Sequence, residues 1–184
     1  MINKKITVVV LISFLLFSCK DFSLLKKPQD LSGKDLSNKE YQNVSFLKAN
    51  FRQAKLTNSI FDNVIFKGSD FTEADISNSI IKNSDLKGAV FNKTDIFGVD
   101  FSFSDLSGAD FSKKDLSNVN FSMCKLNNVN FNGAILTGAI FSGADLTKAN
   151  FEDATVELKQ LFNAKKLENT VMPYGTLYNK KGLF

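Results

Sequence analysis

The most constraining feature of this sequence is an apolar residue at every fifth position. The series runs from residue 31 to residue 161, and all 27 of its positions are apolar, with no insertion or deletion. A period of five matches neither the 3.6 residues of an α-helical turn nor the two-residue alternation of a β-strand. The repeat therefore predicts a short extended segment followed by a turn in every unit.

Two further positions of the unit are restricted. The residue two before the large one is small at 22 of 23 positions between residues 44 and 154. Lys114 is the exception, and a local bulge or an outward-reaching side chain is expected there. The residue two after the large one is Gly or Asn at 16 of 25 positions between residues 33 and 153. Because Gly and Asn tolerate positive φ, these positions are predicted to form tight corners. Each unit then points one large and one small side chain inward.

Residues 109–113 (Ala-Asp-Phe-Ser-Lys) and 144–148 (Ala-Asp-Leu-Thr-Lys) carry the motif most clearly. They resemble the pentapeptide-repeat family, whose pattern is Ala-Asp/Asn-Leu/Phe-polar-polar, and the resemblance covers about residues 31–151. It implies an all-β fold, a right-handed quadrilateral β-helix with twenty residues per coil. Coils of that length place Phe over Phe in two opposite columns, one of which contains Phe51, Phe71, Phe91, Phe111, Phe131 and Phe151.

The ends of the repeat predict the division of the chain. After Ala154 the pattern stops, and Thr155 is expected to be the N-cap of a short capping helix that reaches about Lys165. The predicted parts are a signal peptide at 1–18, a lipidated tether at 19–30, the β-helix at 31–154, a helical cap at 155–175 and a loose tail at 176–184.

The N-terminus resembles an export signal. Lys4 and Lys5 precede an uncharged apolar run at residues 6–17, and twelve residues are too few for a helix to span a bilayer, which needs about 20. Residues 16–19 (Leu-Phe-Ser-Cys) resemble the lipobox of bacterial lipoproteins, although Phe17 stands where a small residue is usual.

The lipobox resemblance implies that Cys19 is acylated with fatty-acid chains such as palmitate. The protein would then be exported and lipid-anchored to a bacterial membrane as part of the cell envelope, with stable anchoring from two or more chains. The alternative is an ordinary cleaved signal in which Cys19 has no role.

The composition argues against several function classes. Without residues 1–18 the chain has 21 basic and 19 acidic residues, which is too balanced to predict a nucleic-acid partner. The chain has no His to act as a base for its many Ser residues. We therefore expect no enzyme activity, cofactor, metal or small-molecule substrate, and Cys124, at a small inward position, is expected to be a core residue.

Outward Asp residues are the strongest candidates for chemistry, but they follow the repeat. A paired-carboxylate or metal site would require an additional cluster, and the sequence contains none. We therefore assign them no catalytic role. They are Asp75, Asp95 and Asp115 on one side, and Asp85, Asp105 and Asp145 on the opposite side.

Outward apolar residues suggest a contact face instead. Phe103 and Met123 are twenty residues apart at the same outward phase, and Phe97 lies across the preceding corner. Ile60 and Ile80 form a second outward pair on the same side. These five residues are the candidate interaction face, and the alternative is an ordinary scatter of apolar residues over the surface.

The leading hypothesis is a membrane-tethered, non-catalytic interaction or structural module of the cell envelope. Its partner would be an unidentified protein or a second copy of itself. One alternative, taken from the family resemblance, is a DNA-mimicking protein that binds topoisomerase, a role that requires a cytosolic address and a strongly acidic surface. A second alternative is an enzyme that acts on envelope glycans.

Overall fold

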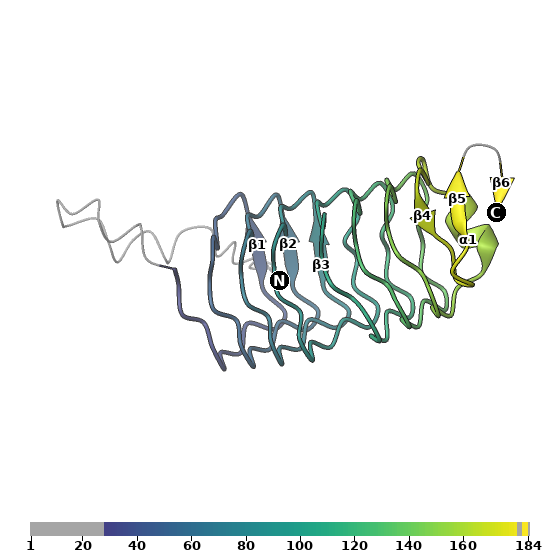
Figure 1. Ribbon diagram of the computed structural model, residues 1–184. Helices are drawn as coiled ribbons and strands as arrows, with labels where there is room; N and C mark the ends of the chain where they lie inside the picture. The colour runs from purple at the N-terminus through teal and green to yellow at the C-terminus, as the bar shows by residue number, and fades with distance from the viewer. Residues whose placement is uncertain (1–27, 180–181, 184) are drawn as a thin grey trace, which may run out of the picture.

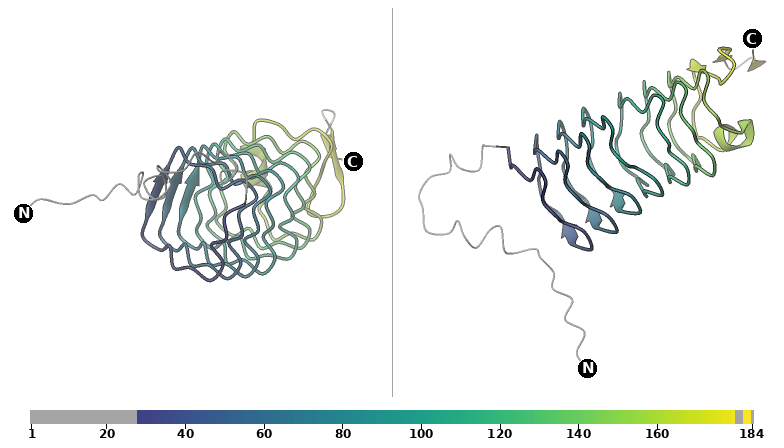
Figure 2. Two further views of the ribbon diagram at one scale, coloured as in Figure 1. Left: turned by 90° about the vertical axis from the view of Figure 1, so that its left-hand side faces the viewer. Right: turned by 90° about the horizontal axis from the view of Figure 1, so that it is seen from below.

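The computed structural model describes residues 28–179 and 182–183, which form a narrow rod of stacked coils (Figure 1). The predicted signal peptide, most of the tether and Cys19 lie outside these residues. Seen from the N-terminal end, the coils lie one behind another (Figure 2, left).

The coils are joined by parallel β-pairing. Strands β1 (Glu40–Gln42), β2 (Ile60–Asp62) and β3 (Ile80–Lys82) form one sheet in that order, with Tyr41 beside Phe61 and Phe61 beside Ile81. Further bridges recur every five residues and join residues twenty apart, as between residues 85 and 105. The prediction of an all-β solenoid is confirmed.

The core consists of the large apolar residues of the repeat. Every one of them from residue 41 to residue 151 is buried, which confirms the predicted inward phase. Phe rings stack along each column, with centroids 4.8 Å apart for Phe131 and Phe151. Between columns they meet edge to face, as for Phe141 and Phe151 at 5.7 Å. Aromatic pairs favour both arrangements, and these ring contacts link successive coils along most of the rod.

Small polar residues at the inward position are also satisfied. The Ser69 hydroxyl donates a hydrogen bond of 2.6 Å to the Phe46 carbonyl, and Ser104 and Thr94 make equivalent bonds to carbonyls of the preceding coil. These bonds allow hydroxyl groups inside an otherwise apolar core, because a buried polar group is costly only when it is unpaired.

The corners have the predicted left-handed backbone. All 25 residues two positions after a large residue, from residue 33 to residue 153, have φ between 52° (Lys93) and 75° (Gly108). Asn and Gly occupy most of these corners. At the other corners bulkier side chains adopt a conformation that costs them about 1–2 kcal/mol.

The ladder is interrupted at one place, beside Lys114. Within the described chain no bridge joins residue 90 to 110 or 95 to 115. The neighbouring coils are bridged at the same positions, 70 to 90 and 75 to 95 before the gap, and 110 to 130 and 115 to 135 after it. Lys114 occupies an inward position that holds Thr94 in the preceding coil and Ala134 in the following one, and its side chain is only partly buried. The coils separate here because a charged side chain cannot be accommodated in the core. The sequence predicted a bulge or an outward-reaching side chain at this position.

The C-terminal segment begins with α1 (Leu158–Phe162), whose N-cap is Glu157 in a capping box with Gln160. The prediction that Thr155 is the N-cap and that the helix reaches Lys165 was wrong. Thr155 still belongs to the ladder, because it pairs with Ile135 and its N–H donates to the Ala134 carbonyl. After α1 the chain returns to the stack, with Lys166 beside Asp145.

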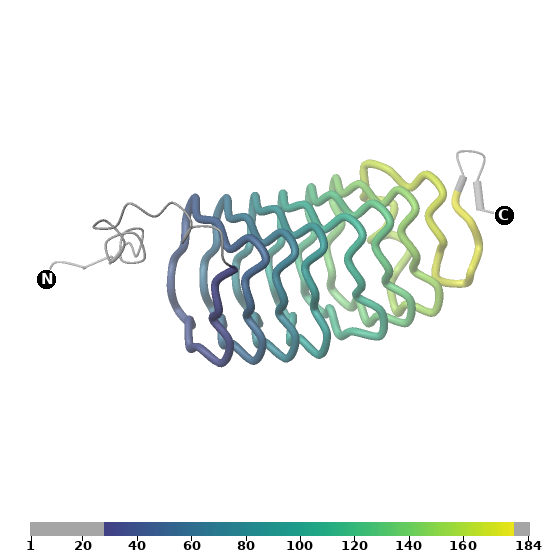
Figure 3. Tube along the Cα trace, turned by 60° about the vertical axis from the view of Figure 1, so that its left-hand side comes forward, coloured from purple at the N-terminus to yellow at the C-terminus, as the bar shows by residue number. Residues whose placement is uncertain are grey.

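The chain ends in a small antiparallel sheet of order β4 (Thr170–Val171), β5 (Leu177–Asn179) and β6 (Gly182–Leu183) (Figure 1). In the trace of Figure 3 the C-terminal part of the chain, in yellow, lies at the end of the rod opposite the first coils. This differs from the loose tail expected at 176–184. The sheet forms because a turn, in which the Met172 N–H donates to the Thr176 carbonyl, brings β5 against β4. None of the described helices is long and apolar enough to cross a membrane.

Candidate interaction face

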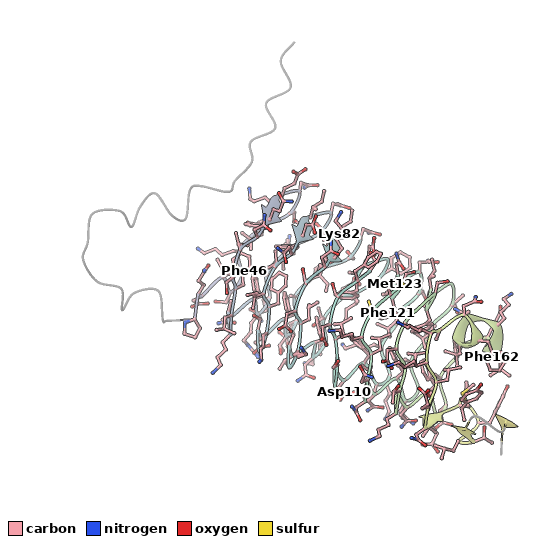
Figure 4. All side chains as sticks on the ribbon, turned by 90° about the horizontal axis from the view of Figure 1, so that it is seen from above. Phe46, Lys82, Asp110, Phe121, Met123 and Phe162 are labelled. Atoms are coloured by element: carbon pink, nitrogen blue, oxygen red, sulfur yellow. The ribbon has the colours of Figure 1, made fainter. Side chains whose placement is uncertain are left out.

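Two opposite sides of the rod differ sharply in charge. We define the low-charge face as residues 57–63, 77–83, 97–103, 117–123 and 137–143, which contain three charged residues: Asp62, Lys82 and Asp100. The equivalent segments ten residues further on contain ten charged residues: Lys67, Asp70, Glu73, Lys87, Lys93, Asp110, Lys113, Lys148, Glu152 and Asp153. Figure 4 places Lys82 and Met123 along one long edge of the rod and Asp110 on the opposite edge.

The few charges of the low-charge face are largely neutralised locally. Lys82 forms an ion pair of 3.5 Å with Asp62. Asp100 accepts a hydrogen bond of 2.9 Å from the Ser102 N–H and has no ion pair among the described residues. Asp100 is therefore the one uncompensated charge in this face.

The same face contains large exposed apolar side chains. The exposed fraction is 59% for Phe103, 52% for Met123 and 43% for Phe97. Ile140, which is not among the residues predicted from the sequence, is 48% exposed on the same face. The repeat does indicate this position, because Ile140 lies 60 residues, or three coils, after Ile80 at the same outward phase.

The structure brings the five predicted face residues onto one side but not into one cluster. Phe103 and Met123 occupy the same corner of successive coils, where their N–H groups donate to the Ser122 and Ser142 carbonyls. Ile60 and Ile80 are paired in the β2–β3 register and are only partly exposed. Among the described rings, those of Phe97 and Phe103 contact no other aromatic ring.

Phe103 and Met123 stand at corners where the backbone disfavours them. Their φ values are 62° and 59°, whereas earlier coils carry Asn at this corner. There the Asn63 amide donates a hydrogen bond of 2.7 Å to Asn43. The other corners without Gly or Asn carry Lys, Gln, Glu or Asp, so Phe103 and Met123 are the two apolar residues among the 25 corners of the rod.

Met123 also depends on the next coil. A Cβ atom on Gly143 would collide with the Met123 sulfur, so the thioether lies directly over that glycine. Gly143 therefore leaves the space that Met123 fills along the low-charge face, while half of the Met123 surface still reaches solvent.

The outward Asp residues serve the turns. The Asp145 carboxylate accepts hydrogen bonds from the Thr147 N–H and hydroxyl and an ion pair of 2.8 Å from Lys166. Burial alone would raise its pKa, but these bonds more than offset that and lower the pKa to about 2. A general acid needs the opposite shift, because it must hold a proton near neutral pH.

Asp105 also has hydrogen bonds and ion pairs that lower its pKa, and its ion pairs are with two lysines. It forms ion pairs with Lys87 at 2.9 Å and Lys125 at 3.4 Å, and accepts hydrogen bonds from Ser107. Burial raises its pKa, but the bonds from Ser107 and Lys87 outweigh burial, so the pKa is lowered. Nowhere in the described chain do three or more His, Cys, Asp or Glu gather as metal ligands.

Cys124 lies in the core at the predicted small inward position. Its thiol contacts the Phe101 carbonyl at 2.9 Å, and burial raises its pKa to about 12. Since only the thiolate is an effective nucleophile, burial disfavours reaction at Cys124 in the folded protein.

Comparison with family models gives two matches. A pentapeptide repeat region model matches residues 54–131, and a model of eight pentapeptide repeats matches residues 115–153. Together they cover residues 54–153, which is more than half of the chain. A search of curated proteins finds no match.

Several solved structures are similar. QnrB1, a plasmid-mediated fluoroquinolone resistance protein, is 20% identical with a TM-score of 0.43, over 74% of this chain and 79% of that chain. HetL, from the cyanobacterium Nostoc sp. strain PCC 7120 and involved in heterocyst differentiation regulation, is 22% identical with a TM-score of 0.30, over 84% and 95%. Rfr23 from the cyanobacterium Cyanothece 51142 is 18% identical with a TM-score of 0.27, over 78% and 90%.

Proposed function

Because this chain belongs to the pentapeptide-repeat family, we propose that it is a non-catalytic binding module, tethered to a bacterial membrane, that contacts a protein through its low-charge face. The observation that carries the proposal is the placement of Phe103 and Met123, which are exposed and held at positive φ on the side of the rod with the fewest charges. The backbone disfavours both residues at these corners, and more than half of the surface of each remains exposed.

The tether is the second part of the proposal. It rests on the apolar run at residues 6–17 and on Cys19, which lie outside the described residues. Cys19 and Pro28, the first described residue, are nine positions apart, so the tether reaches at most about 30 Å when extended. An acylated Cys19 would thus keep the rod close to the membrane surface.

We also infer the finer architecture of the rod. Bridges at every fifth residue between residues twenty apart support a four-sided coil, and the family resemblance supports a right-handed one. We infer that α1 caps the C-terminal end of the rod. In support, Leu161 is fully buried and the Gln160 amide donates to the Leu136 and Ala139 carbonyls. Covering the last coil in this way protects a β-edge from aggregation.

The experiment combines crosslinking in intact bacteria with two sets of variants. The Phe103→Asn, Met123→Asn double variant replaces the two apolar residues by the residue that earlier coils carry at this corner. We expect it to keep or raise the melting temperature, because Asn tolerates positive φ, and to lose its protein crosslinks. Unchanged crosslinks would show that the partner binds elsewhere. The matched control is Lys93→Asn, Lys113→Asn, at successive corners of the opposite, charged face, which should leave the crosslinks intact.

The anchor is tested in the same cells. The wild-type chain is expected to incorporate labelled fatty acid and to partition into detergent, and Cys19→Ser should abolish both. A Cys19→Ser chain that still takes up the label would rule out acylation at this residue. Retention of the wild type in the cytosol would instead favour the topoisomerase-binding alternative.

A further inference from the structure

The low-charge face has a pattern that fits a second copy of itself. Its central column consists of Ile80, Asp100, Asn120 and Ile140, which are paired in succession along the rod. The corner column beside it contains Phe103, in the same coil as Asp100, and Met123, in the same coil as Asn120. The position of a coil along the rod is called its level below. Reversing the order of levels places Ile against Ile, Asp against Asn and Phe against Met.

We propose that two copies of this chain associate through their low-charge faces as antiparallel rods. The two-fold axis crosses the rods between the levels of residues 100 and 120. Such an axis keeps each column opposite itself and reverses the levels, as an isologous interface requires. Ile80 then faces Ile140 of the second copy, Asp100 faces Asn120, and Phe103 faces Met123.

Charge selects the antiparallel arrangement over the parallel one. In a parallel pair the axis runs along the rods, so Asp100 lies opposite Asp100 of the second copy. Two carboxylates would be brought together in an apolar setting, and neither has an ion pair among the described residues. In the antiparallel pair the Asn120 amide is available to donate to Asp100, so the one uncompensated charge of the face gains a partner.

The ends of the face also match. In the antiparallel pair the level of Ile60 lies opposite α1 of the second copy, because the Gly143 N–H donates to the Asn163 carbonyl and so places α1 one level beyond Ile140. α1 exposes the Phe162 ring, which is an apolar partner for Ile60. The opposite face has no such relation, since it carries charges of both signs in no matching order.

The inference rests on the proposed function for the choice of face, and a shared membrane would raise the local concentration of the two copies. The test uses the full chain in bacterial membranes and a short bis-maleimide as crosslinker. One chain carries Ile80→Cys and a second, differently tagged chain carries Ile140→Cys. Cys124 is buried and remains unreactive.

We expect a crosslinked dimer when the two chains are produced together, and at least a tenfold lower yield when either is produced alone. The matched control is Val90→Cys with Asn150→Cys, at the same spacing on the opposite face, which should give no dimer. Adding Phe103→Asn and Met123→Asn to both chains should abolish the dimer.

Two outcomes would overturn the inference. A dimer of the Ile140→Cys chain alone would indicate parallel rods. Absence of the mixed dimer, together with crosslinks to another protein that Phe103→Asn and Met123→Asn remove, would leave the proposed function intact and reject self-association.

Discussion

The outward Asp residues show how the backbone of the coil favours the ionised form of individual side chains. In each of many coils an Asp carboxylate accepts the N–H of the residue two positions later, as Asp110 does from Ser112 and Asp115 from Ser117. This bond closes the turn and favours the ionised form, since it is made to the carboxylate. The Asp series along the rod is therefore explained by turn formation.

Asp145 gives a prediction on acid stability. Its pKa of about 2 lies below the ordinary 3.8, so it stabilises the folded state above about pH 4 and loses that contribution as the pH falls toward 2. Asp145→Asn should lower the free energy of unfolding by about 1 kcal/mol at neutral pH, because the Lys166 partner is half exposed to solvent, and should flatten the decline between about pH 4 and pH 2. Urea unfolding across this range measures both effects. Asp95→Asn is the matched control, because Asp95 caps a turn without an ion pair in the described chain; equal losses in both variants would contradict the prediction.

Among the structural elements, the interrupted ladder beside Lys114 stands out. Burial lowers the pKa of the Lys114 ammonium, and the nearby Asp110 only partly compensates. The coils before and after it carry Thr94 and Ala134 at the same inward position, and both are buried. The break is therefore a local consequence of one side chain in an otherwise uniform stack.

Lys114→Ala is expected to close the ladder. With a small residue at this position, residues 90 and 110 can pair, and the melting temperature should rise, corresponding to roughly 1–2 kcal/mol from removing a desolvated charge. In hydrogen exchange the amides of Phe91 and Ile96 should exchange faster than those of Phe71 and Ile76 in the wild type, and equally slowly in the variant. A lower melting temperature for Lys114→Ala would show that the ammonium contributes a stabilising contact.

At the scale of the whole molecule, the rod is stabilised by contacts between successive coils. Phe111 illustrates this, because its buried ring lies 5.3 Å from that of Phe91 and 5.8 Å from that of Phe131. In a solenoid each coil contacts only its neighbours, so truncating a core side chain in one coil weakens the contacts of that coil with the coils on both sides. The middle of the rod is therefore as sensitive to truncation as a globular core.

Phe111→Ala should lower the free energy of unfolding by roughly 3–5 kcal/mol, because it removes a buried aromatic ring and leaves a cavity. Ser112→Ala, at the next position but outward, should change it by less than about 0.5 kcal/mol. Thermal unfolding followed by circular dichroism compares the two. Equal melting temperatures would be incompatible with the observed inward and outward phases.

Much of the candidate site could be predicted from the sequence, because the coil period places residues twenty apart in one column. The period predicts Phe103 and Met123 as neighbours, but the predicted face does not include Ile140 or the contrast in charge between opposite sides of the rod. The period alone also says nothing about exposure. Ile60 and Ile80 prove to be partly covered by their pairing in β2 and β3.

The sequence by itself determined the phase of the core, the positions of the corners and the all-β class, because an unbroken five-residue period leaves only one set of side chains to bury. The tertiary structure decided the features at which the five-residue period competes with another interaction of the same residue. Lys114 opens the ladder and Thr155 remains in it, while residues after Gly175 pair with β4. These outcomes depend on backbone hydrogen bonds between segments that approach each other only in the folded chain, so no local pattern of residues specifies them.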